Sequence, residues 1–437
     1  MVDPSRWHIF AAQPLRHRDF EGPMTDLTLQ SELATQGSSD EVGFLLRLAR
    51  AMHAYGYPAQ RVEGLLAEVA RRLGLTAQFF STPTSFMASF GTLEHQRTHL
   101  IRVEPGDVDL GKCADVEAVA RDVVAGRCTP ADGSAELERL HAEPPRYGTI
   151  ATVTAFGFSS CAASRFLGGG LREALVAGVI GLVIGILGAL AGRLPTLRRV
   201  FPFLAALSAS AIAAAAAAVL NHYSVYVGTL SGLIVLIPGL ALTTAMTELS
   251  SGHLSSGTAR LSGALMLFLL IGFGVAMGSQ LVTLALGDQP AMVRPEQLPG
   301  WTWWLALVGA PLGFAVLFRA HARDVGWILM AGALGIAGSR AGSAAFGPEL
   351  GAFVGALSVG VASNLYAYWL RRPASVTLVP GILLLVPGAI GFRSLSSLLD
   401  REVVTGMETA FTMVLIAAGL VAGLLLANVL VRERRYA

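Results

Sequence analysis

Long apolar stretches separated by short polar connections fill residues 149–437, whereas residues 1–148 alternate between polar and apolar positions over much shorter distances. A helix that crosses a membrane needs roughly 20 predominantly apolar residues. The pattern therefore predicts a polytopic α-helical membrane protein with a soluble N-terminal part. Ten stretches qualify as spans: 149–167, 171–191, 198–220, 224–247, 258–286, 301–319, 325–341, 346–370, 375–396 and 403–431.

One pattern within these stretches occurs twice. Gly232 is followed by five aliphatic residues and Pro238-Gly239, and the same arrangement returns 149 residues later from Gly381 to Pro387-Gly388. Proline removes a backbone donor and clashes with the preceding turn, so each stretch is expected to break its helix. Broken helices at corresponding places in two halves indicate the binding site of a secondary transporter. Two kinks that only serve packing are the alternative.

The two interrupted stretches are spans four and nine, so an odd number of spans separates them and they run in opposite directions. The match extends past the breaks, because Leu249 pairs with Leu398 and Gly257 with Gly406 at the same offset. This predicts two five-helix inverted repeats with broken helices, 149–286 and 301–431.

Arginine placement orients the spans. With the N-terminus in the cytoplasm, the clusters Arg198–Arg199, Arg371–Arg372 and Arg434–Arg435 all fall on the cytoplasmic side, as positively charged connections usually do. The expected location is the bacterial inner (plasma) membrane, with both termini cytoplasmic.

Polar side chains follow each break. The hydroxyls of Thr243, Thr244 and Ser394 can bond the carbonyls that a broken helix frees, or a small hydroxylated zwitterion. Asn364 in span eight is either a packing contact or a substrate contact. The predicted substrate-binding residues are Gly232, Pro238, Gly239, Thr243, Thr244, Asn364, Gly381, Pro387, Gly388 and Ser394.

Two carboxylates lie close to the spans and are candidates for proton coupling. A carboxylate near hydrocarbon is costly to ionise, which suits Glu248 and Glu408 to carrying a proton. The alternative for Glu248 is that it only ends span four and pairs with Arg260.

The N-terminal part divides in two. Residues 1–38 are polar and aperiodic, so disorder is expected. Residues 40–145 read as a small α+β cytoplasmic domain with one core. Its expected helices are Glu41–Ala54, Arg61–Leu73, Asp115–Val124 and Pro130–Leu140, and its expected strands are Gln78–Phe80, Ser85–Phe90 and Thr98–Val103.

Composition removes several classes of function. The chain is 53% hydrophobic and 14% charged with a net charge of +2, which does not indicate a nucleic-acid partner. Its three cysteines have no metal-binding spacing, and no metal or cofactor is expected. The segment Gly106–Cys113 resembles a phosphate-binding loop, but Cys113 replaces the Ser or Thr that holds magnesium. ATP binding is therefore not expected, and transport would be secondary.

Several motifs resemble the threonine/serine exporter family. They are the segment from Leu48 to Glu63, Thr82-Pro-Thr-Ser85, Phe166-Leu-Gly-Gly-Gly170, Leu385-Val-Pro-Gly388 and Gly391-Phe-Arg-Ser394. The resemblance covers roughly residues 42–430. It implies a cytoplasmic domain followed by ten spans, and export of threonine and serine by the proton-motive force. The family commonly has Asp at the end of the fourth span, where this chain has Glu248.

The leading hypothesis is a proton-coupled exporter of small hydroxy amino acids, and not an enzyme. Its partners would be the amino acid, protons and the lipid bilayer, and homo-oligomers are left open. One alternative is a membrane-anchored hydrolase of small peptides or esters, using Ser81 or Ser85 with His53 and Asp107 in the soluble domain. A channel or a purely structural membrane protein is the other. Saturable flux accelerated by counter-substrate would separate a carrier from a channel.

Overall fold

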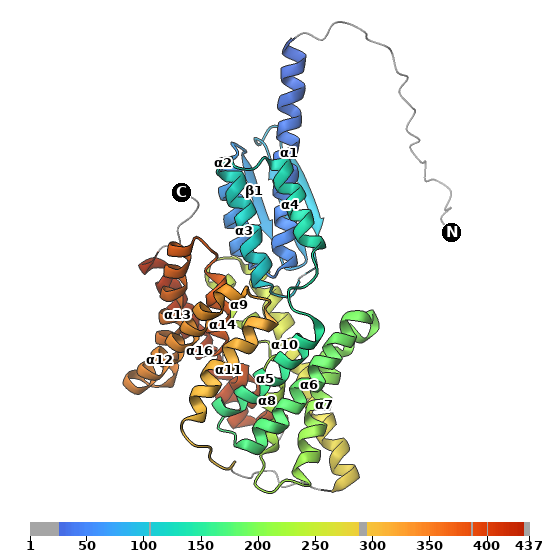
Figure 1. Ribbon diagram of the computed structural model, residues 1–437, viewed down its shortest axis with the longest axis vertical. Helices are drawn as coiled ribbons and strands as arrows, with labels where there is room; N and C mark the ends of the chain where they lie inside the picture. Colours follow the sequence, from blue (N-terminus) through green and yellow to red (C-terminus); the bar gives the residue numbers. More distant parts are fainter. Residues whose placement is uncertain (1–25, 105, 288–294, 386–387, 400, 432–437) are drawn as a thin grey trace, which may run out of the picture.

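The computed structural model has two parts, an N-terminal α+β domain and a helical bundle, and the domain sits on one end of the bundle (Figure 1). The N-terminal part is called the soluble domain below, after the prediction from the sequence. It describes residues 26–104, 106–287, 295–385, 388–399 and 401–431. The end of the bundle that contacts the soluble domain is called the domain face below, and the opposite end the distal face.

The soluble domain is built from four helices and a three-stranded sheet. The helices are α1 (Asp26–Ala54), α2 (Ala59–Arg72), α3 (Leu110–Val124) and α4 (Pro130–Ala142). The strands β1 (Ala77–Ser81), β2 (Ser85–Phe90) and β3 (Arg97–Arg102) form an antiparallel sheet in that order. The expected strands are thus confirmed to within one residue at each end.

Two helices begin five or more residues earlier than the sequence pattern predicted. α1 starts at Asp26, within the range where disorder was expected, in a segment rich in the helix-favouring residues Leu, Gln and Glu. α3 starts at Leu110 because Asp109 caps it, with its side chain accepting a hydrogen bond from the Lys112 N–H at 2.9 Å.

A single hydrophobic core joins these elements. It contains Phe44, Leu48 and Met52 of α1, Leu66 of α2 and Phe86 of β2, all almost completely buried. Phe44, Leu48 and Met52 follow one another at intervals of four residues along α1, which places one apolar stripe against the sheet and the other helices.

The bundle follows directly. Its first helices are α5 (Thr149–Phe166), α6 (Leu171–Arg193), α7 (Pro195–Ala217), α8 (Val225–Leu233), α9 (Gly239–Ser250) and α10 (Leu254–Leu286). The others are α11 (Thr302–Leu317), the 3₁₀ turn Ala322–Asp324, α12 (Val325–Phe346), α13 (Pro348–Leu370), α14 (Ser375–Leu383), α15 (Gly388–Leu399) and α16 (Val403–Leu430).

Among the described residues, seven helical segments are long and apolar enough to cross a membrane. α11 is apolar but shorter, and the α8–α9 region is split into pieces of 9 and 12 residues that are each too short. The protein is therefore a polytopic helical membrane protein, while the ten expected spans stay a prediction.

Candidate functional site

The repeated Gly/Pro pattern interrupts two helices at the places that the sequence predicted. α8 ends at Leu233 and α9 begins at Gly239, immediately after Pro238, which cannot donate a backbone hydrogen bond. α14 ends at Leu383 and α15 begins at Gly388. Pro387 lies outside the described residues.

The two breaks touch each other. A Cβ built on Gly388 would lie 2.6 Å from Ile237 Cγ2 and 3.5 Å from Gly239 Cα. Only a glycine permits this approach without displacing Ile237, which is itself buried. Residues that are far apart in the chain therefore bring two helix interruptions to one place.

The first break leaves backbone groups unpaired within the described part of the chain. The carbonyls of Ile234, Val235 and Leu236 accept no backbone hydrogen bond there, and the N–H groups of Leu240 and Ala241 donate none. Free N–H groups at a helix start attract a carboxylate, and free carbonyls attract an ammonium group. The break thus offers both halves of a zwitterion a partner.

The predicted hydroxyl side chains lie near the breaks, and two of them donate hydrogen bonds to backbone carbonyls. Thr243 Oγ1 donates to the Gly239 carbonyl at 3.1 Å, and Ser394 Oγ donates to the Gly406 carbonyl at 2.7 Å. Thr244 is half-buried on the same helix as Thr243. The hydroxyl oxygens of Thr243 and Ser394 are left to act as acceptors.

Two of the predicted glycines permit close helix packing. A Cβ on Gly232 would come within 2.4 Å of Ile180 on α6, and one on Gly381 within 2.8 Å of Val359 on α13. Gly232 also accepts a hydrogen bond from Ser160 of α5 at 3.1 Å. These contacts hold each broken helix against its neighbours.

Two predicted residues lie elsewhere. Asn364 donates to the Asn428 side chain at 2.9 Å and to the Val431 carbonyl at 3.0 Å, which ties α13 to the end of α16. Glu408 is exposed near the start of α16. The structure does not bring either side chain to the touching breaks.

Glu248 occupies the corner between α9 and α10, fully buried against the soluble domain. Its carboxylate accepts from the Ala59 N–H at 2.8 Å, from Ser256 Oγ at 2.8 Å and from Arg260 Nε at 3.0 Å. Ala59 is the first residue of α2, so a carboxylate of the bundle caps a helix of the soluble domain. The pairing with Arg260 is the one that the sequence offered as an alternative role.

A second corner of the domain face carries the segment that resembles a phosphate-binding loop. The Leu110 N–H donates to the Phe318 carbonyl at 2.8 Å, and Asp109 pairs with Arg319 at 3.4 Å. A Cβ on Gly111 would lie 2.7 Å from the Arg319 carbonyl oxygen. The glycine is thus needed for docking on the bundle.

A polar chain links the soluble domain to α10. Ser81 Oγ lies 3.1 Å from His53 Nε2, and the Ser81 N–H donates to Glu63 at 2.7 Å. Glu63 in turn pairs with His253 Nε2 at 3.2 Å. Burial, with a smaller contribution from Arg260, lowers the pKa of His53 from 6.5 to about 4.

Two of the four residues of the hydrolase alternative therefore meet. Ser81 and His53 are both nearly fully buried, whereas Asp107 is exposed and Ser85 bonds Thr82 at 2.8 Å. A serine nucleophile needs access for its substrate as well as a base, so this pair alone does not favour hydrolysis.

Sequence reasoning missed two carboxylates that are fully buried in the bundle, Glu173 and Asp324. Glu173 accepts from the Gly170 N–H at 2.9 Å and from the Ser224 N–H at 2.7 Å. Asp324 accepts from Tyr366 Oη at 3.0 Å and pairs with Arg372. Each directly follows the first hairpin turn of its half, and this shared position was the available signal.

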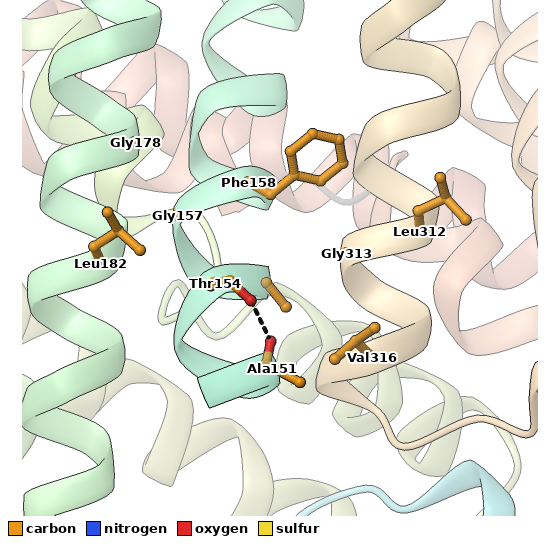
Figure 2. Close-up of a pocket in the computed structure, with 10 residues that line it drawn as sticks. Ala151, Thr154, Gly157, Phe158, Gly178, Leu182, Leu312, Gly313 and Val316 are labelled. Atoms are coloured by element: carbon orange, nitrogen blue, oxygen red, sulfur yellow. Dashed lines mark hydrogen bonds between the residues drawn. The ribbon is translucent and has the colours of Figure 1, made fainter. Parts of the chain in front are cut away.

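A groove of about 560 Å³ lies between α5, α6 and α11 (Figure 2). Its lining is mostly apolar, and Thr154 already donates to the carbonyls of Ile150 and Ala151 at 3.0 Å. The residues of the touching breaks do not line it. A zwitterionic ligand would find few partners in this groove, so the breaks are the stronger candidate site.

Two family profiles match the chain. One is described as "Putative threonine/serine exporter" (ThrE) and matches residues 43–282, and the other is described as "Threonine/Serine exporter, ThrE" and matches residues 303–430. The chain belongs to the threonine/serine exporter family. The resemblance seen in the sequence is thereby confirmed over almost the same range. No solved structure matches this exporter-family chain.

Curated relatives of this family member are yeast membrane proteins. "Pheromone-regulated membrane protein 10" of Eremothecium gossypii is 26% identical over 80% of the chain and 48% of its own length. The protein of the same name in Saccharomyces cerevisiae is 26% identical over 85% of the chain and 48% of its own length. The Candida albicans protein of this name is 25% identical over 84% of the chain and 34% of its own length. The chain thus spans about half or less of these relatives.

Proposed function

We propose that this protein is a secondary transporter that exports small hydroxy amino acids such as threonine and serine, driven by proton exchange. The observation that carries the proposal is the contact between the two broken helices at Gly388, Ile237 and Gly239. Broken helices that meet inside a bundle are where secondary transporters bind their substrates. Membership of the threonine/serine exporter family supports the substrate class.

Matching helix lengths support a repeated architecture. Each half contains a helix of 9 residues, a break and a helix of 12 residues, and α9 and α15 begin at the same offset of 149 as α10 and α16. A Cβ on Gly257 would meet Leu249 Cγ at 2.7 Å, and one on Gly406 would meet Leu398 Cγ at 2.6 Å. The leucines and the glycines that the sequence matched at an offset of 149 thus make equivalent contacts in the two halves.

Backbone conformation supports the same repeat. Left-handed residues occur in pairs separated by 149 positions, namely His222 with Arg371 and Gly252 with Arg401. The non-glycine members of these pairs adopt an unusual conformation, so a shared turn is the simplest physical reason for them.

Opposite helix directions support an inverted relation between the halves. α10 begins at the domain face, where His253 contacts Glu63. α16 ends on the same side as α13, whose Tyr366 packs against Ala114 of the soluble domain. Two five-span halves in one membrane, with both termini on the domain face, follow from this proposal. We place the domain face on the cytoplasmic side of a plasma membrane.

The touching breaks would bind the substrate by its charged ends. The free N–H groups of Leu240 and Ala241 suit the carboxylate, and the carbonyls of Ile234–Leu236 suit the ammonium group. Thr243, Thr244 and Ser394 would bond the substrate hydroxyl through their oxygens, near Pro238 and the glycines that allow the breaks to touch.

The first test is uptake of radiolabelled threonine and serine into proteoliposomes, with and without an imposed pH gradient. Saturable uptake that is faster with unlabelled amino acid inside the vesicles, and that follows the gradient, is expected of a coupled carrier. Absence of flux for both amino acids, in vesicles that hold folded protein, would contradict the proposed substrate class.

Glu248 is the proposed proton-coupling residue, because it is buried and ends the helix that starts at the first break. We expect Glu248→Gln to abolish pH-driven flux and to keep exchange of labelled for unlabelled substrate. Ser256→Ala is the matched control, because it removes one hydrogen bond to the same carboxylate but leaves the titratable group. If pH-driven flux survives in Glu248→Gln, Glu248 only docks the soluble domain.

A further inference from the structure

Glu173 and Asp324 stand at opposite faces of the bundle. Glu173 lies at the distal face, where Arg165 at the end of α5 bonds Thr302 at the start of α11 at 2.9 Å. Asp324 lies at the domain face, where the end of α11 accepts a hydrogen bond from Leu110. Both side chains are 0% exposed.

The turns before the two carboxylates are alike. Gly168 and Arg319 are both left-handed and lie 151 positions apart, as Glu173 and Asp324 do. The Gly169 N–H donates to the Ser164 carbonyl, and the Ala320 N–H donates to the Ala315 carbonyl, both at 2.8 Å. The two carboxylates are therefore equivalent positions of the two halves.

Each carboxylate also holds the segment from which the broken helix of its own half starts. Glu173 accepts the N–H of Ser224, the residue that caps α8. Asp324 pairs with Arg372, which lies in the short connection before α14. The two contacts thus fix the distal entry of the first broken helix and the domain-face entry of the second.

Both surroundings contain polar atoms without a partner among the described residues. They are Tyr223 Oη and Ser164 Oγ near Glu173, and Asp324 Oδ2 itself. A buried polar atom without a partner is costly, so such atoms suit positions that change partners in another state.

We propose that Glu173 and Asp324 are paired positioning residues that close the two faces of the transporter, Glu173 the distal face and Asp324 the domain face. Each carboxylate releases its contact when its own face opens, while the other contact is kept. This inference rests on the proposed carrier with two inverted halves.

The test uses the full-length protein in lipid nanodiscs and measures how fast a water-soluble maleimide alkylates one introduced cysteine. Thr229→Cys in α8 and Thr377→Cys in α14 replace residues that are now almost fully buried. Peptide mass spectrometry separates these sites from Cys113, Cys128 and Cys161. Glu173→Gln and Asp324→Asn are each combined with each of the two cysteine substitutions.

Reciprocal changes are expected. Glu173→Gln should speed alkylation in the Thr229→Cys protein and slow it in Thr377→Cys, and Asp324→Asn should do the opposite. The expected change is about tenfold, because a lost hydrogen bond to a charged group shifts a two-state equilibrium by that order. Glu349→Gln, which neutralises an exposed carboxylate at the start of α13, should change neither rate.

Changes in the same direction at both cysteines would overturn the proposal, because a purely structural role loosens the whole bundle. If Asp324→Asn does not fold, Tyr366→Phe removes one hydrogen bond to Asp324 and should give a smaller change in the same direction. At the distal face, Glu173→Asp is the milder substitution, because it keeps the charge but shortens the side chain. It should give a smaller change in the same direction as Glu173→Gln. Alkylation needs no substrate, so reciprocal rates without threonine or serine flux would contradict only the substrate class.

Discussion

At the scale of single residues, the soluble domain contains a buried histidine with an unusual protonation equilibrium. His53 is held neutral by burial and by Arg260, which lower its pKa to about 4, while Ser81 bonds its ring. In the unfolded chain its pKa is near 6.5, so the unfolded state binds more protons between these values. The contribution of neutral His53 to the free energy of unfolding is therefore fully present above pH 6.5 and is lost as the pH falls towards 4.

We expect the thermal unfolding temperature to fall as the pH is lowered from 6.5 to 4. Protonation of His53 should lower the free energy of unfolding by about 3 kcal/mol over this range. His53→Gln keeps a polar partner for Ser81 but cannot titrate, so its unfolding temperature should depend less on pH. The measurement is fluorescence-detected unfolding across this pH range. His95→Gln, at an exposed position, should behave like the unmodified protein, and equal pH profiles for all three would contradict the assignment.

At the scale of elements, glycine decides where two broken helices meet. Gly388 lies against Ile237 and Gly239, and no larger residue fits there without displacing Ile237. The helix breaks themselves come from local backbone chemistry. Their contact comes from the packing of α8, α9, α14 and α15 with the surrounding helices.

We expect Gly388→Ala to reduce threonine or serine flux, because its Cβ would lie 2.6 Å from Ile237 Cγ2. Ile237→Ala in the same chain should restore part of the flux by making room, which a double-mutant cycle in the proteoliposome assay would measure. Gly263→Ala is the control, since nothing lies within 4 Å of its added Cβ. Additive losses in the double variant would show that the contact does not matter.

At the scale of the whole molecule, the soluble domain bridges both halves of the bundle. It contacts the first half through Glu248 and Arg260, and the second half through Phe318 and Arg319. Any motion of one half against the other at the domain face must change at least one of these contacts. In the proposed carrier, the domain is therefore placed to influence opening on that side.

Gly111→Ala is expected to loosen the second contact, because its Cβ would lie 2.7 Å from the Arg319 carbonyl oxygen. Hydrogen exchange at the Leu110 amide, which donates to Phe318, should then speed up by about tenfold for each 1.4 kcal/mol of docking energy lost. Gly64→Ala adds a Cβ in open space on α2 and should leave this amide unchanged. Unchanged exchange in Gly111→Ala would mean that the bundle adjusts without undocking.

Several features could be predicted from the sequence because they depend on local chemistry. Apolar length identified the membrane part, alternation identified β1 to β3, and Gly/Pro pairs located both helix breaks. Family motifs gave the exporter family, which the profile matches confirm. In each case a few neighbouring residues carry the signal, so no knowledge of distant contacts was needed.

Tertiary structure decided which polar groups come together. Glu248 could be named from its position, but its contact with Ala59 joins residues 189 positions apart. Glu173 and Asp324 are buried by contacts with Ser224 and Tyr366, which lie 51 and 42 positions away, so only their shared position after a hairpin turn marked them in the sequence. Burial and partners are set by packing between distant segments, whereas helix breaks and spans are set by the local backbone and side-chain pattern.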